Sequence, residues 1–247
     1  MSEPNEPLRI ERRDGAWTFV LQRPDKRNAL SAGLVERLLD GVAEAHAQHA
    51  RVLVFRGEGR NFSAGFDFAD LDQHSDGDLL LRFVRIETLL QAVASSPCLT
   101  VALAHGRNFG AGVDLFAACR QRIASADASF RMPGLKFGLV LGTRRFGRIV
   151  GAERAARIQQ QAATFDAAQA IEMGFVHELQ EPNRWDAAIA EALTAATTLD
   201  DWSRSALYGA LNGSHVAPQH DADLAALVRS AARPGLRERV RHYLGTP

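Results

Sequence analysis

The chain has 247 residues, and its 29 Lys and Arg residues balance its 29 Asp and Glu residues. This length lets one α/β domain bury a large core, and the lack of net charge disfavours binding to nucleic acid. No apolar run approaches the roughly 20 residues that span a bilayer, and the polar start is unlike a signal peptide. We therefore expect a cytoplasmic protein with no membrane partner. Cys98 and Cys119 lack the spacing of a zinc site, so we expect buried thiols and no metal.

The first half of the chain alternates between strand and helix patterns. Residues 8–12 and 16–21 predict a β-hairpin joined by an Asp-Gly turn that tolerates positive φ. Ser31 can cap a helix whose leucines and valines recur at helical spacing, and residues 52–55 predict a buried parallel strand. The pattern continues with a helix at 79–93, a strand at 99–104 and a short buried helix at 113–119.

Loops that contain glycine follow two of the predicted strands, at residues 57–67 and 105–112. In an open α/β sheet, ligands bind at the carboxyl ends of the strands, so these loops are the first candidates for a functional site. After Ile149 the sequence becomes rich in Ala and Leu at helical spacing. We therefore divide the chain into an α/β core at residues 1–180 and a C-terminal helical region at 181–247. The helices expected after Ile149 span residues 153–161, 167–173, 185–197, 202–211 and 224–243.

Several partial motifs fail when their full patterns are required. The acidic run at residues 70–78 starts like a calcium loop but has no Glu at the twelfth position, so we expect a solvated loop. Gly110 and Gly112 begin a dinucleotide fingerprint whose third glycine is missing. Asn61 stands where a nucleophile elbow around Ser63 would need glycine, which disfavours a serine hydrolase.

The loop segments 61–67 and 105–114 could instead build an oxyanion hole together. Small residues let a ligand approach the backbone closely, and N–H groups from two loops could converge on one oxygen. The second segment opens a helix, whose unpaired N–H groups and dipole favour negative charge.

These segments resemble the two signature loops of the crotonase (enoyl-CoA hydratase/isomerase) superfamily, in the same order, and the similarity runs from about Trp17 to about Leu179. The resemblance implies a crotonase-like ββα spiral of stacked βαβ turns with a C-terminal helical region, assembled as a homotrimer or hexamer. It also implies an acyl-CoA thioester as substrate, with CoA as part of that substrate and no separate cofactor. The matching residues are Pro24, Asn28 to Leu30, 62–67, Gly106, 110–114, 124–130, Gly142, Thr143, Arg145, Gly151 and 167–176.

Carried over by position, the resemblance makes the N–H groups of Phe66 and Ala111 the donors to the thioester oxygen. It makes Asp114 the catalytic acid or base. The alternative for Asp114 is a carboxylate that gains about 0.3–1 kcal/mol from the helix dipole, but its apolar neighbours favour catalysis. Surface solubility is an equal alternative for Lys26 and Arg27. The residues expected along the substrate and CoA path are Lys26, Arg27, Ala64, Phe66, Asp67, Phe68, Ala69, Ala111 and Gly134.

The sequence departs from the family at Gly134, which stands where hydratases carry a second catalytic glutamate, and no nearby carboxylate replaces it. Hydration needs one group to activate water and another to protonate carbon. We therefore expect a hydratase/isomerase-type enzyme, a lyase or isomerase, with Asp114 as its single acid–base residue. Thioester hydrolysis, decarboxylation, ring opening and non-catalytic acyl-CoA binding remain open, as do the acyl group and the pathway.

Overall fold

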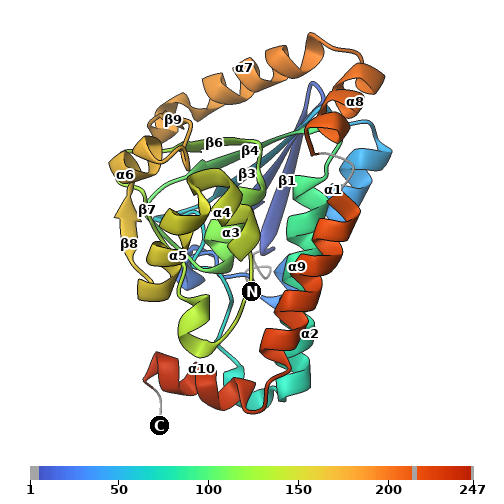
Figure 1. The fold of residues 1–247 in the computed structure, drawn as a ribbon. Helices are drawn as coiled ribbons and strands as arrows, with labels where there is room; N and C mark the ends of the chain where they lie inside the picture. The colour runs from blue at the N-terminus through green and yellow to red at the C-terminus, as the bar shows by residue number, and fades with distance from the viewer. Residues whose placement is uncertain (1–5, 213–215, 246–247) are drawn as a thin grey trace, which may run out of the picture.

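A six-stranded sheet forms the scaffold of the computed structural model, which describes residues 6–212 and 216–245. Its strand order is β1-β2-β3-β4-β6-β9 (Figure 1). The first two strands pair antiparallel as the predicted hairpin, and every later pair in this order is parallel. The strands span Leu8–Arg13 (β1), Ala16–Leu21 (β2), Val52–Gly57 (β3), Leu99–Ala104 (β4), Gln121–Ala124 (β6) and Glu178–Leu179 (β9).

The helices span Ala32–Ala47 (α1), Asp76–Ala94 (α2), Ala111–Ala118 (α3), Thr143–Val150 (α4), Ala152–Gln161 (α5), Ala167–Glu172 (α6), Trp185–Thr197 (α7), Asp201–Asn212 (α8), Val216–Ala231 (α9) and Leu236–Leu244 (α10). Ser31 caps α1 as predicted, accepting a hydrogen bond from the Leu34 N–H at 3.3 Å. The single helix expected at 224–243 is wrong, because Gly235 adopts a φ of 72° and the chain turns between α9 and α10. No helix within the described ranges has the length and apolar character that a membrane span requires.

A second sheet contains three short strands. β7 (Ser129–Arg131) pairs parallel with β5 (Arg107–Phe109) and antiparallel with β8 (Thr164–Asp166). Sequence patterning does not predict these strands, because three residues are too few to show an alternation of apolar and polar side chains. β5 lies inside the loop expected at residues 105–112 and leads into α3 after a single glycine, Gly110.

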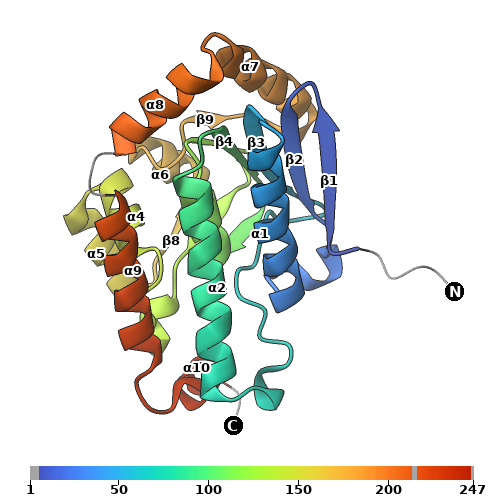
Figure 2. The same cartoon turned by 90° about the vertical axis from the view of Figure 1, so that its right-hand side faces the viewer.

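The alternation of side chains along β3 divides the apolar core between two layers. Leu53 and Phe55 belong to the larger cluster, which also contains the buried faces of α1 and α2. Val52 and Val54 point to the other face of the sheet and pack with α7. Figure 2 shows α1 and α2 side by side over the sheet. The predicted helices and buried strands of the core are therefore confirmed.

The acidic run at residues 70–78 is mostly exposed, as its composition suggests, but it is not loop throughout. Its second half begins α2, which Ser75 caps. The Asp76 carboxylate accepts hydrogen bonds from the N–H groups of Leu236 and Arg237 at 3.0 and 2.9 Å. These contacts tie the start of α10 to the start of α2.

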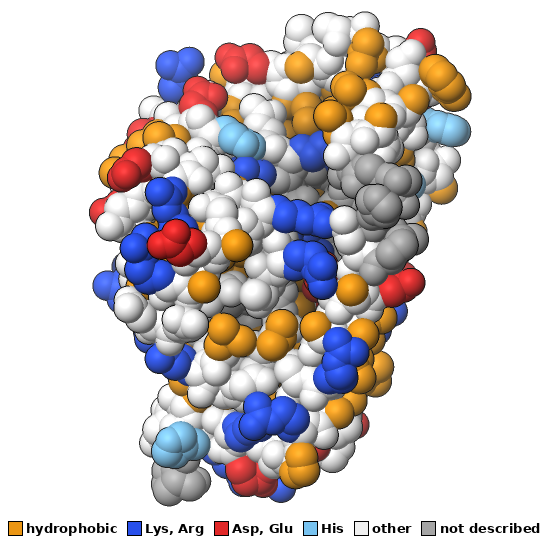
Figure 3. All heavy atoms as spheres, in the orientation of Figure 1, with side chains coloured by type: hydrophobic (Ala, Val, Ile, Leu, Met, Phe, Trp, Pro, Cys, Tyr) orange, Lys and Arg blue, Asp and Glu red, His pale blue; other side chains and the backbone are white. Residues whose placement is uncertain are grey.

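Two kinds of side chain gather on the face drawn in Figure 3. Basic side chains lie at its centre, where α4 and α9 approach each other, and hydrophobic side chains gather over α8. On α8, Trp202 is 79% exposed and Leu211 is 76% exposed. The apolar groups of α8 therefore remain uncovered within this one chain.

Candidate active site

A cavity of about 270 Å³ lies where the two predicted loops meet, and most of its wall is apolar or aromatic. A concave, mainly apolar pocket with a few polar groups is the usual form of a small-molecule site. The described residues contain no cluster of His, Cys, Asp and Glu that could hold a metal ion. The wall includes Arg27, Ala64, Phe66, Phe68, Phe83, Ala111, Asp114, Gly134, Phe137, Leu139, Thr143, Tyr243 and Leu244.

The two loops approach each other closely at Gly65. A Cβ added to Gly65 would overlap the Phe109 carbonyl oxygen and would lie 3.0 Å from the Ala111 nitrogen. Gly65 also adopts a φ of 78°, which residues with a side chain seldom adopt. Glycine at this position therefore lets the peptide before Phe66 lie beside the peptide before Ala111.

The N–H groups of Phe66 and Ala111 have no acceptor among the described residues. The first loop bridges to Leu30 through the Gly65 carbonyl and the Asp67 N–H, which leaves the Phe66 N–H between them unused. Ala111 is the first residue of α3, so its N–H has no acceptor within the helix. Such a pair of donors, one from a loop and one at a helix N-terminus, is suited to an oxyanion hole.

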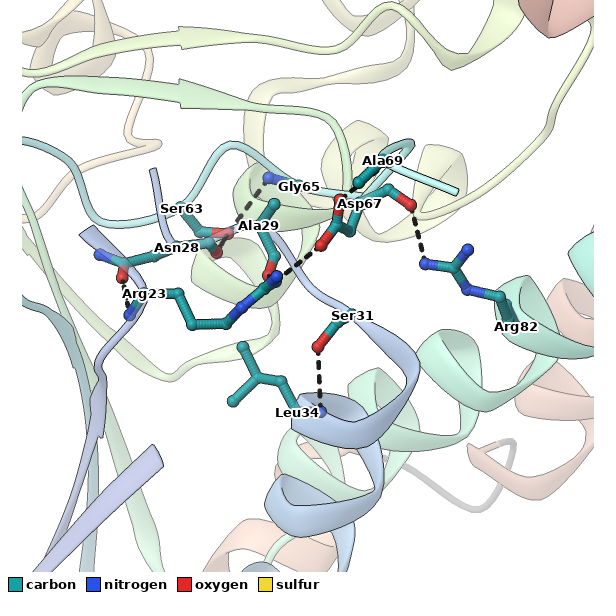
Figure 4. A network of polar contacts seen from close by, with 10 residues as sticks. All are labelled: Arg23, Asn28, Ala29, Ser31, Leu34, Ser63, Gly65, Asp67, Ala69 and Arg82. Atoms are coloured by element: carbon teal, nitrogen blue, oxygen red, sulfur yellow. Dashed lines mark hydrogen bonds and ion pairs between the residues drawn. The ribbon is translucent and has the colours of Figure 1, made fainter. Parts of the chain in front are cut away.

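A buried hydrogen-bond network fixes the first loop before any ligand arrives (Figure 4). The Ser63 hydroxyl donates to the Asn28 carbonyl at 2.8 Å and accepts from the Gly65 N–H at 3.1 Å. Asn28 and Ser63 are both fully buried. The loop geometry is therefore set by the protein interior.

Asp67 belongs to the same network and faces away from the cavity. Arg23 donates to the Asp67 carboxylate at 2.7 Å, and the Ala69 N–H donates to it at 3.0 Å. Burial opposes ionisation of Asp67, but these hydrogen bonds outweigh it and hold the pKa of this carboxyl below its usual value. Asp67 is therefore ionised and holds the loop in place (Figure 4).

Asp114 lies in the first turn of α3, with its carboxyl in the cavity wall. Its side chain is nearly fully buried, and its Oδ1 atom has no hydrogen-bond partner among the described residues. Burial raises the pKa of Asp114 well above its ordinary value of 3.8, although the nearby Arg145 opposes this rise. Gly142 lies so close that a Cβ added there would overlap Oδ1. Burial opposes the ionised form of Asp114, which is the form that would interact favourably with the helix dipole.

Two more buried charged side chains form a pair close to Asp114. Arg145 of α4 donates from Nη2 to the carboxylate of Glu87 on α2 at 3.3 Å, and the two side chains are 12% and 2% exposed. Gln91 also donates to Glu87, at 3.1 Å. Burial raises the pKa of Glu87, and Arg145 opposes that rise. The Nη1 atom of Arg145 is buried without a hydrogen-bond partner in the described part of the chain.

Three of the predicted site residues lie outside the cavity wall. Lys26 is exposed at the end of a short 3₁₀ helix, Pro24–Lys26. Asp67 and Ala69 bond to each other on the far side of the loop. The other predicted residues surround the cavity together: Arg27, Ala64, Phe66, Phe68, Ala111, Asp114 and Gly134.

A second cavity of about 650 Å³ adjoins the first, because both are lined by Arg27, Ala64 and Phe109. Arg60 and Arg107 also line the second cavity. Three arginines therefore surround the space next to the apolar cavity.

Sequence reasoning missed Glu87 and Arg145, although each left a signal. Glu87 stands four residues after Phe83 and three before Leu90, so an acid interrupts the buried face of a predicted helix. A charge at such a position is rarely buried without a partner. Arg145 is one of the residues that match the crotonase pattern, but the resemblance implies no role for it.

Comparison with known proteins identifies the family. The profile of the enoyl-CoA hydratase/isomerase family matches residues 11–218. A crystal structure of a candidate enoyl-CoA hydratase/isomerase from Bordetella parapertussis is 60% identical with a TM-score of 0.94, covering 98% of this chain and 99% of that one. A protein of Mycobacterium tuberculosis named "Probable enoyl-CoA hydratase echA6" is 33% identical over 189 residues, which cover 73% of this chain and 75% of the relative. An enoyl-CoA hydratase from Bacillus halodurans, 22% identical with a TM-score of 0.84, covers 96% of this chain and 100% of its own and shares the fold.

The chain therefore belongs to the enoyl-CoA hydratase/isomerase family, within the crotonase superfamily. The predicted crotonase-like α/β fold is confirmed. The family is one of enzymes, so the prediction of an enzyme is confirmed at that level.

Proposed function

We propose that this enzyme binds an acyl-CoA thioester and moves a double bond within its acyl group, with Asp114 as the single acid–base residue. The observation that carries the proposal is one buried, unpaired carboxyl beside two free backbone N–H groups in an apolar cavity. Gly134 lines the same cavity, and Asp114 is the one carboxylic acid among the residues that line it. Double-bond migration is the family reaction that needs only one such group.

The oxyanion hole stabilises the intermediate. The N–H groups of Phe66 and Ala111 donate to the thioester oxygen, where negative charge develops when a proton leaves the α-carbon. Donors fixed in advance lose no energy in reorganising, and losing one such donor typically costs about 10²- to 10³-fold in rate.

Asp114 carries the proton between two carbons. The substrate carries its double bond between the β- and γ-carbons. The ionised carboxyl takes a proton from the α-carbon, and the electron pair of that C–H bond is shared between the thioester oxygen on one side and, through the double bond, the γ-carbon on the other. The acid then returns the proton to the γ-carbon, which leaves the double bond between the α- and β-carbons. No water is consumed. A raised pKa suits this role, because it makes the ionised form a stronger base and lets the acid hold the proton between the two transfers.

The walls of the two cavities suit the two ends of the substrate. Phe66, Phe83 and Phe137 give the first cavity an aromatic surface for an apolar acyl group. In the second cavity, Arg60 and Arg107 provide charge for the phosphates of CoA. Arg27 lines both cavities, so it takes the position where the pantetheine arm meets the nucleotide.

The test is a panel of short, medium, long and aromatic enoyl-CoAs analysed by mass spectrometry with the wild type and Asp114→Asn. Migration leaves the substrate mass unchanged and alters its retention, hydration adds the mass of water, hydrolysis releases the thiol and decarboxylation loses carbon dioxide. We expect migration by the wild type. Asp114→Asn should lose about 10²- to 10⁴-fold in turnover while calorimetry still shows CoA-ester binding, because the amide keeps its size but cannot take up a proton.

Two results would overturn the proposal. If Asp114→Asn turns over the substrate within a few-fold of the wild-type rate, Asp114 does not transfer the proton. Absence of binding across the whole panel would remove the acyl-CoA substrate.

A further inference from the structure

We propose that Glu87 and Arg145 act as a positioning pair that makes Asp114, and not Glu87, the carboxyl of this buried cluster that takes up and releases a proton. The proposal rests on the proposed function of Asp114 and extends it to two residues that do not touch the substrate.

The geometry places three buried ionisable side chains where α2, α3 and α4 pack together. The Asp114 carboxyl of α3 lies against Gly142, which is the N-cap of α4. Arg145 follows within the first turn of α4 and binds Glu87 on α2 at 3.3 Å. Asp114 is 3% exposed and Glu87 is 1% exposed, so water reaches neither carboxyl freely.

The charges of this cluster do not cancel when all three groups are ionised. Two carboxylates and one guanidinium leave one negative charge, and an uncompensated charge in a protein interior is strongly unfavourable. The cluster therefore favours protonation of one of its two carboxyls. Glu87 has the ion pair with Arg145 and an additional donor in Gln91, whereas Asp114 has no partner among the described residues. Asp114 is therefore the carboxyl that takes up a proton more readily, and it lies in the wall of the catalytic cavity.

The other charged groups around Arg145 leave this balance unchanged. Asp223 of α9 pairs with Arg144 at 2.7 Å, so its charge is already compensated. Burial lowers the pKa of His220, and Arg145 and Arg148 lower it further, so this imidazole is neutral at neutral pH. The basic side chains at the centre of the face in Figure 3 surround the open side of this region. Glu87 is thus the one acid that can balance Arg145 from the interior.

Glu87 is a second buried carboxyl in this region, but it does not replace the glutamate that hydratases carry at the position of Gly134. Glu87 does not line the cavity, so it cannot touch the substrate. Its influence passes through Arg145. Glu87 offsets part of the charge of Arg145, so the guanidinium stabilises an ionised Asp114 less than it would alone, and the two linked carboxyls titrate as one system.

The test uses two charge-removing variants whose effects should have opposite signs. Glu87→Gln keeps a hydrogen-bond acceptor for Arg145 but removes the negative charge that offsets the guanidinium. The titration midpoint of the Asp114 carboxyl should therefore move to lower pH. Arg145→Gln removes the cation, so the midpoint should move to higher pH. Each shift should be about one unit or more, the usual effect of a neighbouring charge on the pKa of a carboxyl. A purely structural role would destabilise both variants without moving the two midpoints apart.

The midpoint can be read without substrate, by carbon-13 NMR of labelled Asp carboxyls assigned with Asp114→Asn. Unfolding free energy gives a second readout. Because burial raises the pKa of Asp114, its contribution to stability is complete below pH 3.8 and is lost as pH rises through the folded value. That loss should occur at lower pH in Glu87→Gln and at higher pH in Arg145→Gln. With a substrate in hand, the kcat profile should shift in the same two directions.

Arg85→Gln, at an arginine of α2 that pairs with Glu36 and not with this cluster, is the control and should leave the midpoint in place. The double variant Glu87→Gln/Arg145→Gln leaves a neutral pair and should return the titration midpoint of Asp114 towards the wild-type value. It therefore separates an effect of charge from a loss of structure in the single variants. Shifts in one direction, or no shift in folded variants, would overturn the proposal. If the titration midpoint shifts in opposite directions but the protein turns over no enoyl-CoA, the role of this pair is supported and only the proposed function is contradicted.

Discussion

Gly142 leaves the space that the buried carboxyl of Asp114 occupies. It adopts a φ of 63°, and an added Cβ would overlap Oδ1 of Asp114. A side chain at this position therefore has two costs, a strained backbone and a displaced carboxyl. These costs can be separated, because Gly174 adopts a similar φ of 71° with no atom within 4 Å of an added Cβ.

Gly142→Ala should abolish most turnover by pushing Asp114 out of position, with a loss of about 10²-fold or more. Gly174→Ala should lose about 1–2 kcal/mol in stability from the same backbone strain and keep its activity. Urea unfolding and kcat for both variants would check this. Equal activity loss in the two would show that strain, and not the displaced carboxyl, is responsible.

The predicted site residues that line the cavity include three whose positions depend on the local backbone. Phe66 and Ala111 follow short glycine-containing segments, and Asp114 lies one turn into the helix that the second segment opens. Asp67 and Ala69 face away because successive residues of an extended loop point to opposite sides, and Phe66 and Phe68 take the cavity side. Glu87 and Arg145 could not be paired from sequence, because packing between two helices brings them together across 58 residues.

At the scale of elements, long periodic segments are predicted well and short or polar ones are not. The hairpin, α1, α2, β3 and β4 carry strong apolar patterns, and each is present. α4 is missed because three arginines occupy its eight residues, and only Phe146 and Val150 are buried. Its helical state comes from its packing against α3 and α5, which no local pattern shows.

α10 is held in place by a contact between distant elements, and this contact can be tested. Asp76→Asn weakens the acceptor for the Leu236 and Arg237 N–H groups, so α10 should exchange its amide hydrogens faster. Since Tyr243 and Leu244 of α10 line the cavity, affinity for long acyl-CoAs should fall while affinity for short ones stays constant. Hydrogen exchange and calorimetry measure the two effects.

Asp72→Asn is the matched control, because Asp72 also contacts α10, through Arg241, but is 78% exposed. An exposed ion pair contributes only about 0–1 kcal/mol, so this variant should bind all chain lengths like the wild type. A loss of short-chain affinity in Asp76→Asn would mean that the site as a whole, and not its far wall, depends on this contact.

At the scale of the whole molecule, the C-terminal helices find different partners. α7 covers the second face of the sheet and α9 packs along α2, so their apolar faces are buried within the chain. α8 has no comparable cover, and Trp202, Leu207 and Leu211 are exposed on it. Uncovered apolar groups of this kind mark a contact with another protein surface.

We therefore predict a homo-oligomer, a trimer or hexamer by resemblance, with α8 in the interface. Light scattering at micromolar concentration should give a mass several times that of one chain. Leu207→Ser with Leu211→Ser should lower that mass, because these side chains lie one helical turn apart and present one face. Leu81→Ser, at a residue of α2 that is 59% exposed, should not. A monomeric wild type would contradict the prediction.

The cavity is closed by parts of the chain that are far apart in sequence, since loops from the first half meet Tyr243 and Leu244 of α10 there. The residues proposed for the chemistry and the residues that limit the depth of the pocket therefore lie on separate segments of the sequence. Substitutions in α10 can change which acyl lengths fit while the oxyanion loops and Asp114 stay untouched. Within such a family, substrate range can drift from one lineage to the next without passing through an inactive ancestor.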